Sequence, residues 1–215
     1  MKIVFATGNP HKLQELKAIA GDCGIEFILP PEGFDPVEDG KTFEENSLIK
    51  AREAAKLSGL LSLADDSGLC VEVLGGAPGI YSARYAQTPQ KRIEKLLKEL
   101  NEILRLKRHF ECSKESQILQ PQNEEIERKA KFVCAMSLVK PNGEILFQTI
   151  GECHGYIAEK QAGTNGFGYD PIFVPLLTRS KGAIKTMAEL SEDEKNQISH
   201  RGIALRKVLE FLKNK

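Results

Sequence analysis

Residues 2–20 read KIVFATGNPHKLQELKAIA, a short apolar run followed by a polar loop and then a helical pattern. The run KIVFA is typical of a buried strand, and it stops at the loop Thr7-Gly8-Asn9-Pro10. Apolar residues then recur at helical spacing from Leu13 to Ala20. This order predicts a strand–loop–helix unit, which is a building block of α/β proteins.

The next segments continue the alternation of strands and helices. IEFIL, residues 25–29, predicts a second strand, and Thr42 and Glu45 stand at the spacing of a capping box that opens a helix ending at Gly59. Farther on, LLSLA and LCVEVL flank a polar tetrapeptide, and Thr88-Pro89 supplies a cap and a first-turn proline for another amphipathic helix.

The second half of the chain predicts a hairpin. KFVCAMSLV (131–139) and EILFQTIGECHGYIA (144–158) are joined by a turn that contains Asn-Gly, a strong hairpin signal. A glycine-rich turn leads into a short strand, and a capping-box spacing at Ser191 precedes one C-terminal helix. These elements predict a mixed sheet covered by helices in a single domain, 1–215. The polar stretch 107–128 is interpreted as an exposed insertion.

Composition and charge exclude several classes of protein. The 215 residues are 41% hydrophobic and 28% charged, and thirty Lys and Arg balance thirty Asp and Glu. We therefore expect a globular protein with no affinity for a nucleic-acid polymer or a membrane surface. There is no long apolar run and no leader pattern, which predicts a soluble cytoplasmic protein. The five cysteines lack zinc spacing and are expected to be reduced, inert thiols.

The loop Thr7-Gly8-Asn9 and Lys12 suit a phosphate, because a helix N-terminus offers free N–H groups and the lysine adds a positive charge. A plain turn with Asn9 as the helix cap is the alternative. The loop matches neither the P-loop pattern nor the dinucleotide fingerprint.

Asp65-Asp66-Ser67-Gly68 interrupts two apolar runs with carboxylates, which Mg²⁺ prefers together with water and phosphate oxygens. Successive residues of a strand point to opposite faces, so only one aspartate can face a given pocket. Glu38 is a plausible second carboxylate, and the alternative is a polar turn between two strands beside a solvated acidic loop.

Two further segments carry candidate binding residues. GTNGFGYD, residues 163–170, combines three glycines with two aromatics, which permits close backbone approach and stacking of a flat ring. His200 and Arg201 lie side by side within the predicted last helix, where Gly202 costs about 1 kcal/mol relative to alanine. A structural turn and a surface histidine are the alternatives.

Taken in order, TGNPHK, TFEENSLIKA, ADDSGLCVEVLGGAPGIYSARYA, GTNGFGYDPIF, TMAEL and ISHRG resemble the non-canonical purine nucleoside triphosphate pyrophosphatases, the ITP/XTP/dITP diphosphatase family. The resemblance runs almost end to end. It implies an elongated α/β fold with two lobes on a long mixed sheet flanked by helices, a substrate cleft between the lobes, and a homodimer. It also implies hydrolysis of ITP, dITP or XTP to the monophosphate and pyrophosphate with Mg²⁺ as cofactor.

The resemblance also assigns roles to individual positions. It implies that Asp66 is the catalytic carboxylate and, with Glu38, the metal site. The residues that it implies for substrate binding are Thr7, Gly8, Asn9, Pro10, His11, Lys12, Ser67, Phe167, Gly168, Tyr169, Asp170, Lys195, His200 and Arg201. The sequence departs from the family in the length of 107–128 and in extra residues before Lys185, so neither receives a role.

Two other functions remain compatible with these residues. One is a related pyrophosphatase whose substrate is a pyrimidine or modified nucleotide. The other is a sensor that binds a nucleotide without cutting it, for which the phosphate loop alone would suffice. The pair Asp66 and Glu38 favours an enzyme, because a binder has less need of a metal and an activated water.

Overall fold

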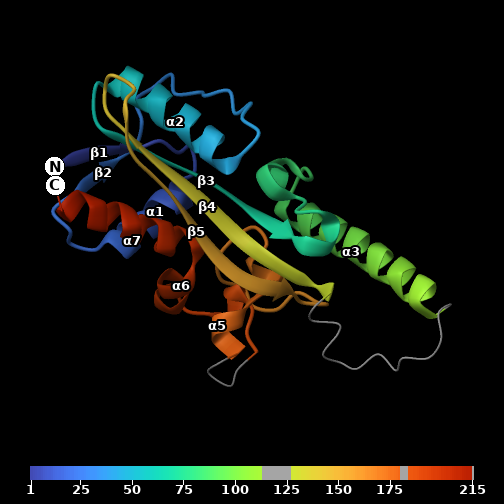
Figure 1. The fold of residues 1–215 in the computed structure, drawn as a ribbon. Helices are drawn as coiled ribbons and strands as arrows, with labels where there is room; N and C mark the ends of the chain where they lie inside the picture. The colour runs from blue at the N-terminus through green and yellow to red at the C-terminus, as the bar shows by residue number, and fades with distance from the viewer. Residues whose placement is uncertain (113–126, 180–183, 215) are drawn as a thin grey trace. The chain divides into compact units, whose positions relative to one another are not determined.

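Six strands form one mixed sheet in the computed structural model, which describes residues 1–112, 127–179 and 184–214 (Figure 1). Their order across the sheet is β2-β1-β3-β4-β5-β6. β1 pairs in parallel with β2 and β3, whereas β5 and β6 pair antiparallel, so the predicted mixed sheet is confirmed. The strands are β1 Lys2–Phe5, β2 Glu26–Ile28, β3 Ser62–Val71, β4 Lys129–Val139, β5 Ile145–Ile157 and β6 Phe173–Pro175.

The helices are distributed along the whole described chain. The α-helices are α1 Pro10–Ala20, α2 Phe43–Ser58, α3 Pro89–Cys112, α5 Leu176–Arg179, α6 Glu192–Ile198 and α7 His200–Lys213. Short 3₁₀ turns are η1 Glu72–Leu74, η2 Gly79–Arg84, η3 Asp170–Ile172 and η4 Met187–Glu189. No helix in the described parts of the chain is both long and apolar enough to cross a bilayer.

The chain forms two compact units that interleave in sequence. Unit 1 comprises Met1–Ser67, Val133–Glu152 and Asn196–Lys215, and unit 2 comprises Gly68–Phe132 and Cys153–Lys195. Strands β3, β4 and β5 each contribute residues to both units. The substrate cleft that the family resemblance implies between two lobes stays a prediction.

Helices cover both faces of the sheet within unit 1. Ile3 and Phe5 of β1 belong to an apolar cluster that includes residues of α1 and α7, which pack against each other. Val4, between them in sequence, belongs instead to a cluster with the alanines of α2. Alternate residues of the strand therefore face different helices, as the period of two requires. The residues after Lys2 are fully buried, which explains why Ile3–Ala6 are all apolar.

The helix ends follow the capping signals in the sequence. Glu45 N donates to Thr42 Oγ1 at the start of α2, and Gly59 ends the helix with a left-handed φ of 67°. Lys91 N donates to Thr88 Oγ1 in the first turn of α3. The hairpin is also confirmed, because Lys140 N donates to Glu144 O across the turn between β4 and β5.

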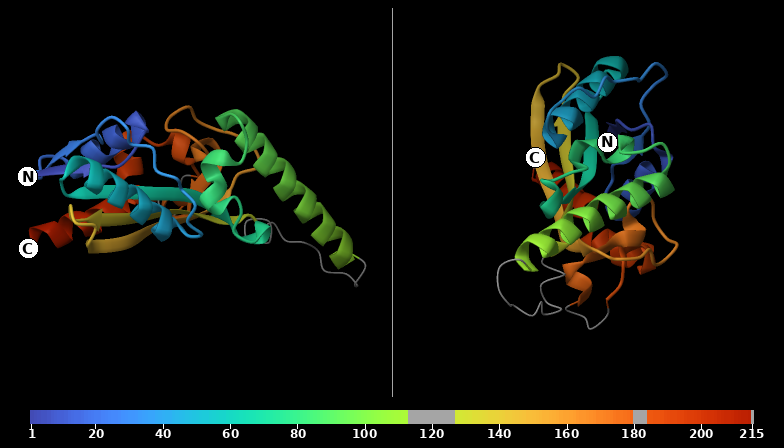
Figure 2. Two further views of the ribbon diagram at one scale, coloured as in Figure 1. Left: turned by 90° about the horizontal axis from the view of Figure 1, so that it is seen from above. Right: turned by 90° about the vertical axis from the view of Figure 1, so that its right-hand side faces the viewer.

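Unit 2 contains α3, the longest helix of the described chain, whose course is plain in both views of Figure 2. The glycine-rich turn leads into η3 and β6, as the sequence predicts. Tyr169 OH donates to Ser82 O, and Leu69 N donates to Ser82 Oγ, so Ser82 joins this turn and the 3₁₀ segment η2 to β3.

Three predictions about elements are corrected. β3 runs unbroken through Asp65–Gly68, so the alternative of a turn there is wrong. The predicted single C-terminal helix is two helices, because Ser199 leaves the helical conformation and caps α7 through Gly202 N. Residues 107–112 of the predicted insertion continue α3, and 113–126 lie outside the described residues.

Candidate active site

The loop between β1 and α1 is held by its own side chains. Asn9 N donates to Thr7 Oγ1 at 3.1 Å, and Asn9 Oδ1 accepts from His11 N at 3.0 Å. Asn9 is therefore the N-cap of α1, with Pro10 in the first turn. A Cβ on Gly8 would meet nothing within 4 Å, so open space lies beside this backbone. The cap and a phosphate site are compatible, because a cap satisfies only part of the helix N-terminus.

Asp65 faces the side of the sheet covered by α1 and α7. Its buried carboxylate lies 3.0 Å from Lys12 Nζ, and Arg201 Nη2 donates to Asp65 Oδ2 at 3.1 Å. Ser67, two residues along the same face, donates from Oγ to Asp65 Oδ2 at 2.8 Å. Arg201 is also paired with Glu15 of α1. The residues predicted at three separate places in the sequence thus meet around one carboxylate in unit 1.

Charge balance explains the chemistry of this cluster. Burial alone would raise the pKa of Asp65, but Lys12 and Arg201 hold that pKa well below its ordinary value. The pKa of Arg201 is raised despite burial, because Asp65 and Glu15 stabilise the charged guanidinium. Asp65 is therefore a fixed anion. It orders two cations and is unsuited to accept a proton during a reaction.

Asp66 faces the opposite side of the sheet, toward α2. Lys50 Nζ donates to Asp66 Oδ1 at 2.9 Å, and Asn46 Nδ2 donates to Asp66 Oδ2 at 3.3 Å. The same ammonium lies 3.4 Å from Glu38 Oε1. Burial raises the pKa of Asp66 above its ordinary value, while Lys50 acts in the opposite direction. Asp65 and Asp66 thus have separate hydrogen-bond partners on opposite faces of the sheet, as expected for successive residues of a strand.

The Asp66 cluster fits a divalent cation by the chemistry of its donors. Glu38 Oε1 and Asp66 Oδ1 both reach one positively charged atom, the ammonium of Lys50. Both are carboxylate oxygens, the ligands that Mg²⁺ takes in ones and twos while keeping water and substrate oxygens. Within the described residues no group of three or more His, Cys, Asp or Glu is placed to hold a metal ion.

A third cluster lies in unit 2 and contains the predicted ring-binding residues. Lys195 Nζ donates to Asp170 Oδ2 at 2.9 Å and lies 4.7 Å from the centre of the Phe167 ring. Phe167 N donates to the same Asp170 oxygen at 2.8 Å, which ties the turn together. Gly166 has a φ of 76°, and a Cβ there would meet that oxygen at 2.1 Å. Phe167 is 38% exposed, so its ring can still meet a ligand.

The other predicted residues lie beside these clusters. His200 is buried in the first turn of α7, next to Arg201. Tyr169 is buried in unit 2 and donates to Ser82 O, and Gly168 has a φ of 64°. The assignment of all these positions to one nucleotide site stays a prediction.

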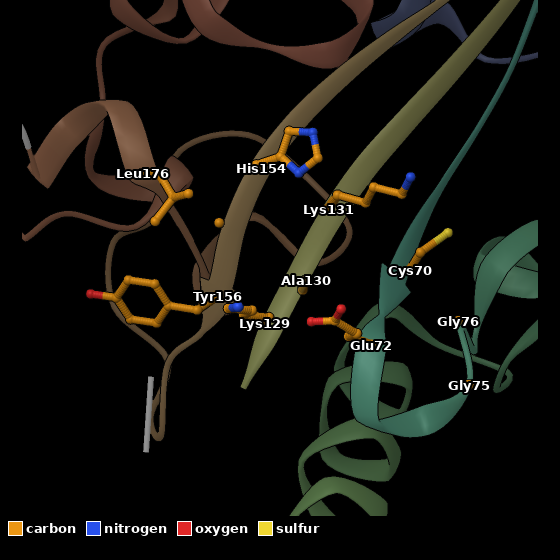
Figure 3. Close-up of a pocket in the computed structure, with 11 residues that line it drawn as sticks. Cys70, Glu72, Gly75, Gly76, Lys129, Ala130, Lys131, His154, Tyr156 and Leu176 are labelled. Carbon is orange, nitrogen blue, oxygen red and sulfur yellow. The ribbon is translucent and has the colours of Figure 1, made fainter. Parts of the chain in front are cut away.

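A separate cavity of about 760 Å³ lies wholly in unit 2 (Figure 3). Lys131 and His154 project from β4 and β5 at one side of it, and Glu72 follows β3. None of the residues predicted from the sequence lines this cavity. Its lining is Cys70, Glu72, Gly75, Gly76, Lys129, Ala130, Lys131, His154, Gly155, Tyr156 and Leu176.

Three charged or polar residues of the site were missed by reasoning from residue patterns. Lys50 and Asn46 stand four positions apart on α2, a spacing that places both on one helix face beside Asp66. That spacing was the available signal, within the quoted TFEENSLIKA. Glu15 carried no signal, because its partner Arg201 is 186 residues away in sequence.

Comparison with known proteins gives consistent matches over nearly the full chain. The Ham1 family profile matches residues 3–115 and 113–211. A dITP/XTP pyrophosphatase of Escherichia coli O157:H7 is 44% identical, with 99% of this chain and 98% of the relative covered. Its counterpart in Synechocystis sp. is 39% identical, with 96% and 93% covered.

Solved structures agree with the sequence matches. A HAM1 protein from Coxiella burnetii has a TM-score of 0.80 and 38% identity, with both chains covered completely. A nucleoside-triphosphatase / dITP/XTP pyrophosphatase from Mycobacterium abscessus has a TM-score of 0.68 and 40% identity, with 99% of this chain and 100% of that chain covered. The fold and its polar clusters define an α/β protein of the mixed-sheet class with a paired-carboxylate site. The chain belongs to the Ham1 family.

Proposed function

We propose that this protein hydrolyses the non-canonical purine nucleotides ITP, dITP and XTP to the monophosphate and pyrophosphate. Relatives that match almost the whole chain are named dITP/XTP pyrophosphatases, which supports the substrate class and the bond. The structural observation that carries the reaction type is that the carboxylates of Glu38 and Asp66 both approach one ammonium group, that of Lys50. Such an enzyme would remove deaminated purines from the nucleotide pool.

The phosphate loop supports a choice of bond. Lys12 is fixed by Asp65 but still 18% exposed at its side chain, so its ammonium can meet a phosphate as well. An ammonium and helix N–H groups beside the β and γ phosphates stabilise the charge that grows on departing pyrophosphate. Water then enters at the α-phosphorus.

The Asp66 cluster supplies the other half of the reaction. Glu38 and Asp66 would hold Mg²⁺, which supplies electrophilic stabilisation of the phosphate oxygens when bound. Asp66 orients the attacking water and accepts its proton, because its carboxylate is buried beside the proposed Mg²⁺ position and burial raises its pKa above the ordinary value. Lys50 donates to Asp66 and balances the negative charge of the two carboxylates.

Product analysis tests this function. Purified protein is incubated with ITP and Mg²⁺, and the products are resolved by anion-exchange chromatography with separate assays for pyrophosphate and orthophosphate. We expect IMP and pyrophosphate in equal amounts. IDP with orthophosphate would contradict the proposal.

A panel of triphosphates separates the remaining possibilities. Preference for a pyrimidine triphosphate would favour the related pyrophosphatase, and binding of ITP without turnover would favour the sensor. We also propose a homodimer, which sedimentation velocity tests, and action in the cytoplasm, which fractionation of the source cells tests. A monomer at assay concentrations would contradict the first of these two.

A further inference from the structure

A single buried amide joins the loop that carries Glu38 to the strand that carries Asp66. Asn46 has no exposed surface, and its Nδ2 donates to Asp66 Oδ2 at 3.3 Å. Its Oδ1 accepts from Gly40 N at 2.9 Å, two residues beyond Glu38. The side chain therefore spans the two segments that supply the carboxylates. Its two side-chain hydrogen bonds are to Gly40 and Asp66, so it acts on Glu38 only through the loop.

The loop lies tightly against the start of α2 at this point. A Cβ on Gly40 would meet Asn46 Oδ1 at 2.6 Å and Glu45 Cβ at 2.8 Å, so no side chain fits there. Lys41 N donates to Glu45 Oε2 at 2.6 Å, a second contact that fixes the loop. The residue after Glu38 and Asp39 must be small for the Asn46 contact to form.

We propose that Asn46 is a positioning residue that sets the separation of Glu38 and Asp66 before a divalent cation binds. The inference rests on the proposed function, in which these two carboxylates hold Mg²⁺. Asn46 acts through its neighbours, because it orients one carboxylate directly and restrains the loop of the other through Gly40. Without Asn46, the loop would have to become ordered when the cation binds, and the lost conformational entropy would lower the affinity for the cation. Partners of metal ligands typically contribute 10–100-fold in affinity.

Three substitutions separate the two contacts from general damage to α2. Asn46→Ala removes both hydrogen bonds. Gly40→Ala keeps the amide but forces the loop away from it, because the new Cβ has no room. Ser47→Ala is the matched control. Ser47 is the next residue of α2 and is equally buried, and its Oγ hydrogen-bonds to Ser137 Oγ at 2.7 Å and to Glu44 O at 2.9 Å, away from both carboxylates.

The test is Mn²⁺ binding to the full-length protein without nucleotide, followed by electron paramagnetic resonance, with thermal unfolding of each variant as a check on folding. We expect Asn46→Ala and Gly40→Ala to weaken Mn²⁺ binding by about tenfold or more. Ser47→Ala should stay within about twofold of the parent. In ITP hydrolysis, the half-saturating Mg²⁺ concentration should rise by a similar factor in the first two variants, with a smaller change in kcat at saturating Mg²⁺.

The outcomes distinguish this inference from the proposed function. If the parent protein binds no Mn²⁺ and is not activated by Mg²⁺, the proposed metal site itself is contradicted. A parent that binds Mn²⁺ while Asn46→Ala binds equally well would overturn the role of Asn46 alone. Equal weakening by Ser47→Ala would also overturn it, because the effect would then belong to the packing of α2. If Asn46→Ala does not fold, Mn²⁺ binding by Gly40→Ala tests the same role, because this variant keeps the Asn46 side chain.

Discussion

Neighbouring aspartates on β3 should have unequal effects on stability when each is replaced by asparagine. Asp65 is fully buried and pairs with Lys12 and Arg201, which hold its pKa below the ordinary value. Asp66 has a raised pKa, chiefly because of burial. At neutral pH the native state therefore favours the charge on Asp65 and disfavours the charge on Asp66. Asp65→Asn should destabilise the protein, whereas Asp66→Asn should not.

The magnitudes follow from the partners that remain. Removing one member of a buried ion pair costs about 3–5 kcal/mol, because a charge is left uncompensated. Arg201 keeps Glu15 and Lys12 is partly exposed, so we expect about 3 kcal/mol for Asp65→Asn, at the lower end of that range. Asp66→Asn should change the free energy of unfolding by less than about 1 kcal/mol, because relief from burying the Asp66 charge is opposed by the loss of a partner for the buried Lys50 ammonium.

Urea unfolding of both variants and the parent at pH 7 measures this difference. With a slope of about 3 kcal/mol per molar, the Asp65→Asn midpoint should fall by about 1 M and the Asp66→Asn midpoint should shift by less than about 0.3 M. The contribution of Asp65 is present above the ordinary aspartate pKa of 3.8 and is lost as pH falls below it, since the native pKa is lower still. The difference in the free energy of unfolding between the parent and Asp65→Asn should therefore become smaller below about pH 4. Equal losses for the two variants would refute the reasoning.

Three further predictions concern catalysis, specificity and thiol reactivity. Asp66→Asn should slow ITP turnover by about 2–4 decades and affect ITP affinity less, as stopped-assay kinetics and equilibrium binding will measure. A near-normal kcat would show that another carboxylate is the general base. Arg201→Ala should lower the ratio of kcat/KM for ITP over ATP if the arginine reads the purine O6 edge, whereas an unchanged ratio with uniformly lower activity would contradict base reading. Burial raises the pKa of Cys134 and of Cys153 to about 12. Peptide mass spectrometry after iodoacetamide at pH 8 should find both unmodified in the native protein while half-buried Cys23 reacts, and rapid labelling of Cys134 would exclude its burial.

Local signals predicted the element boundaries well, because caps act within a few residues. Thr42 and Gly59 bound α2, and Asn9 caps α1 through its own side chain. A local capping signal also indicates the end of one helix and the start of another at Ser199. A serine three residues before a glycine that costs helix stability is a natural N-cap, yet the apolar periodicity across it favoured one continuous helix.

Long-range electrostatics explains what the sequence did not predict. Two adjacent aspartates are typical of a turn, but β3 carries them through its centre because each meets cations from distant segments. Lys12 lies 53 positions from Asp65, and Arg201 lies 136 positions away. The cations that stabilise these two aspartates within the strand come close to them only in the folded chain. The roles of Lys50 and Asn46 were recognised only in the folded structure for the same reason, because their partner Asp66 lies on another element.

Hydrolysis of ITP in water enriched in ¹⁸O tests the central claim most directly. Water that attacks the α-phosphorus leaves its oxygen on the nucleotide, so mass spectrometry should find one ¹⁸O in IMP and none in pyrophosphate. The label should stay in IMP at every substrate concentration if, as proposed, Lys12 and the loop amides select pyrophosphate as the leaving group. Label in pyrophosphate, or labelled orthophosphate beside unlabelled IDP, would contradict the account.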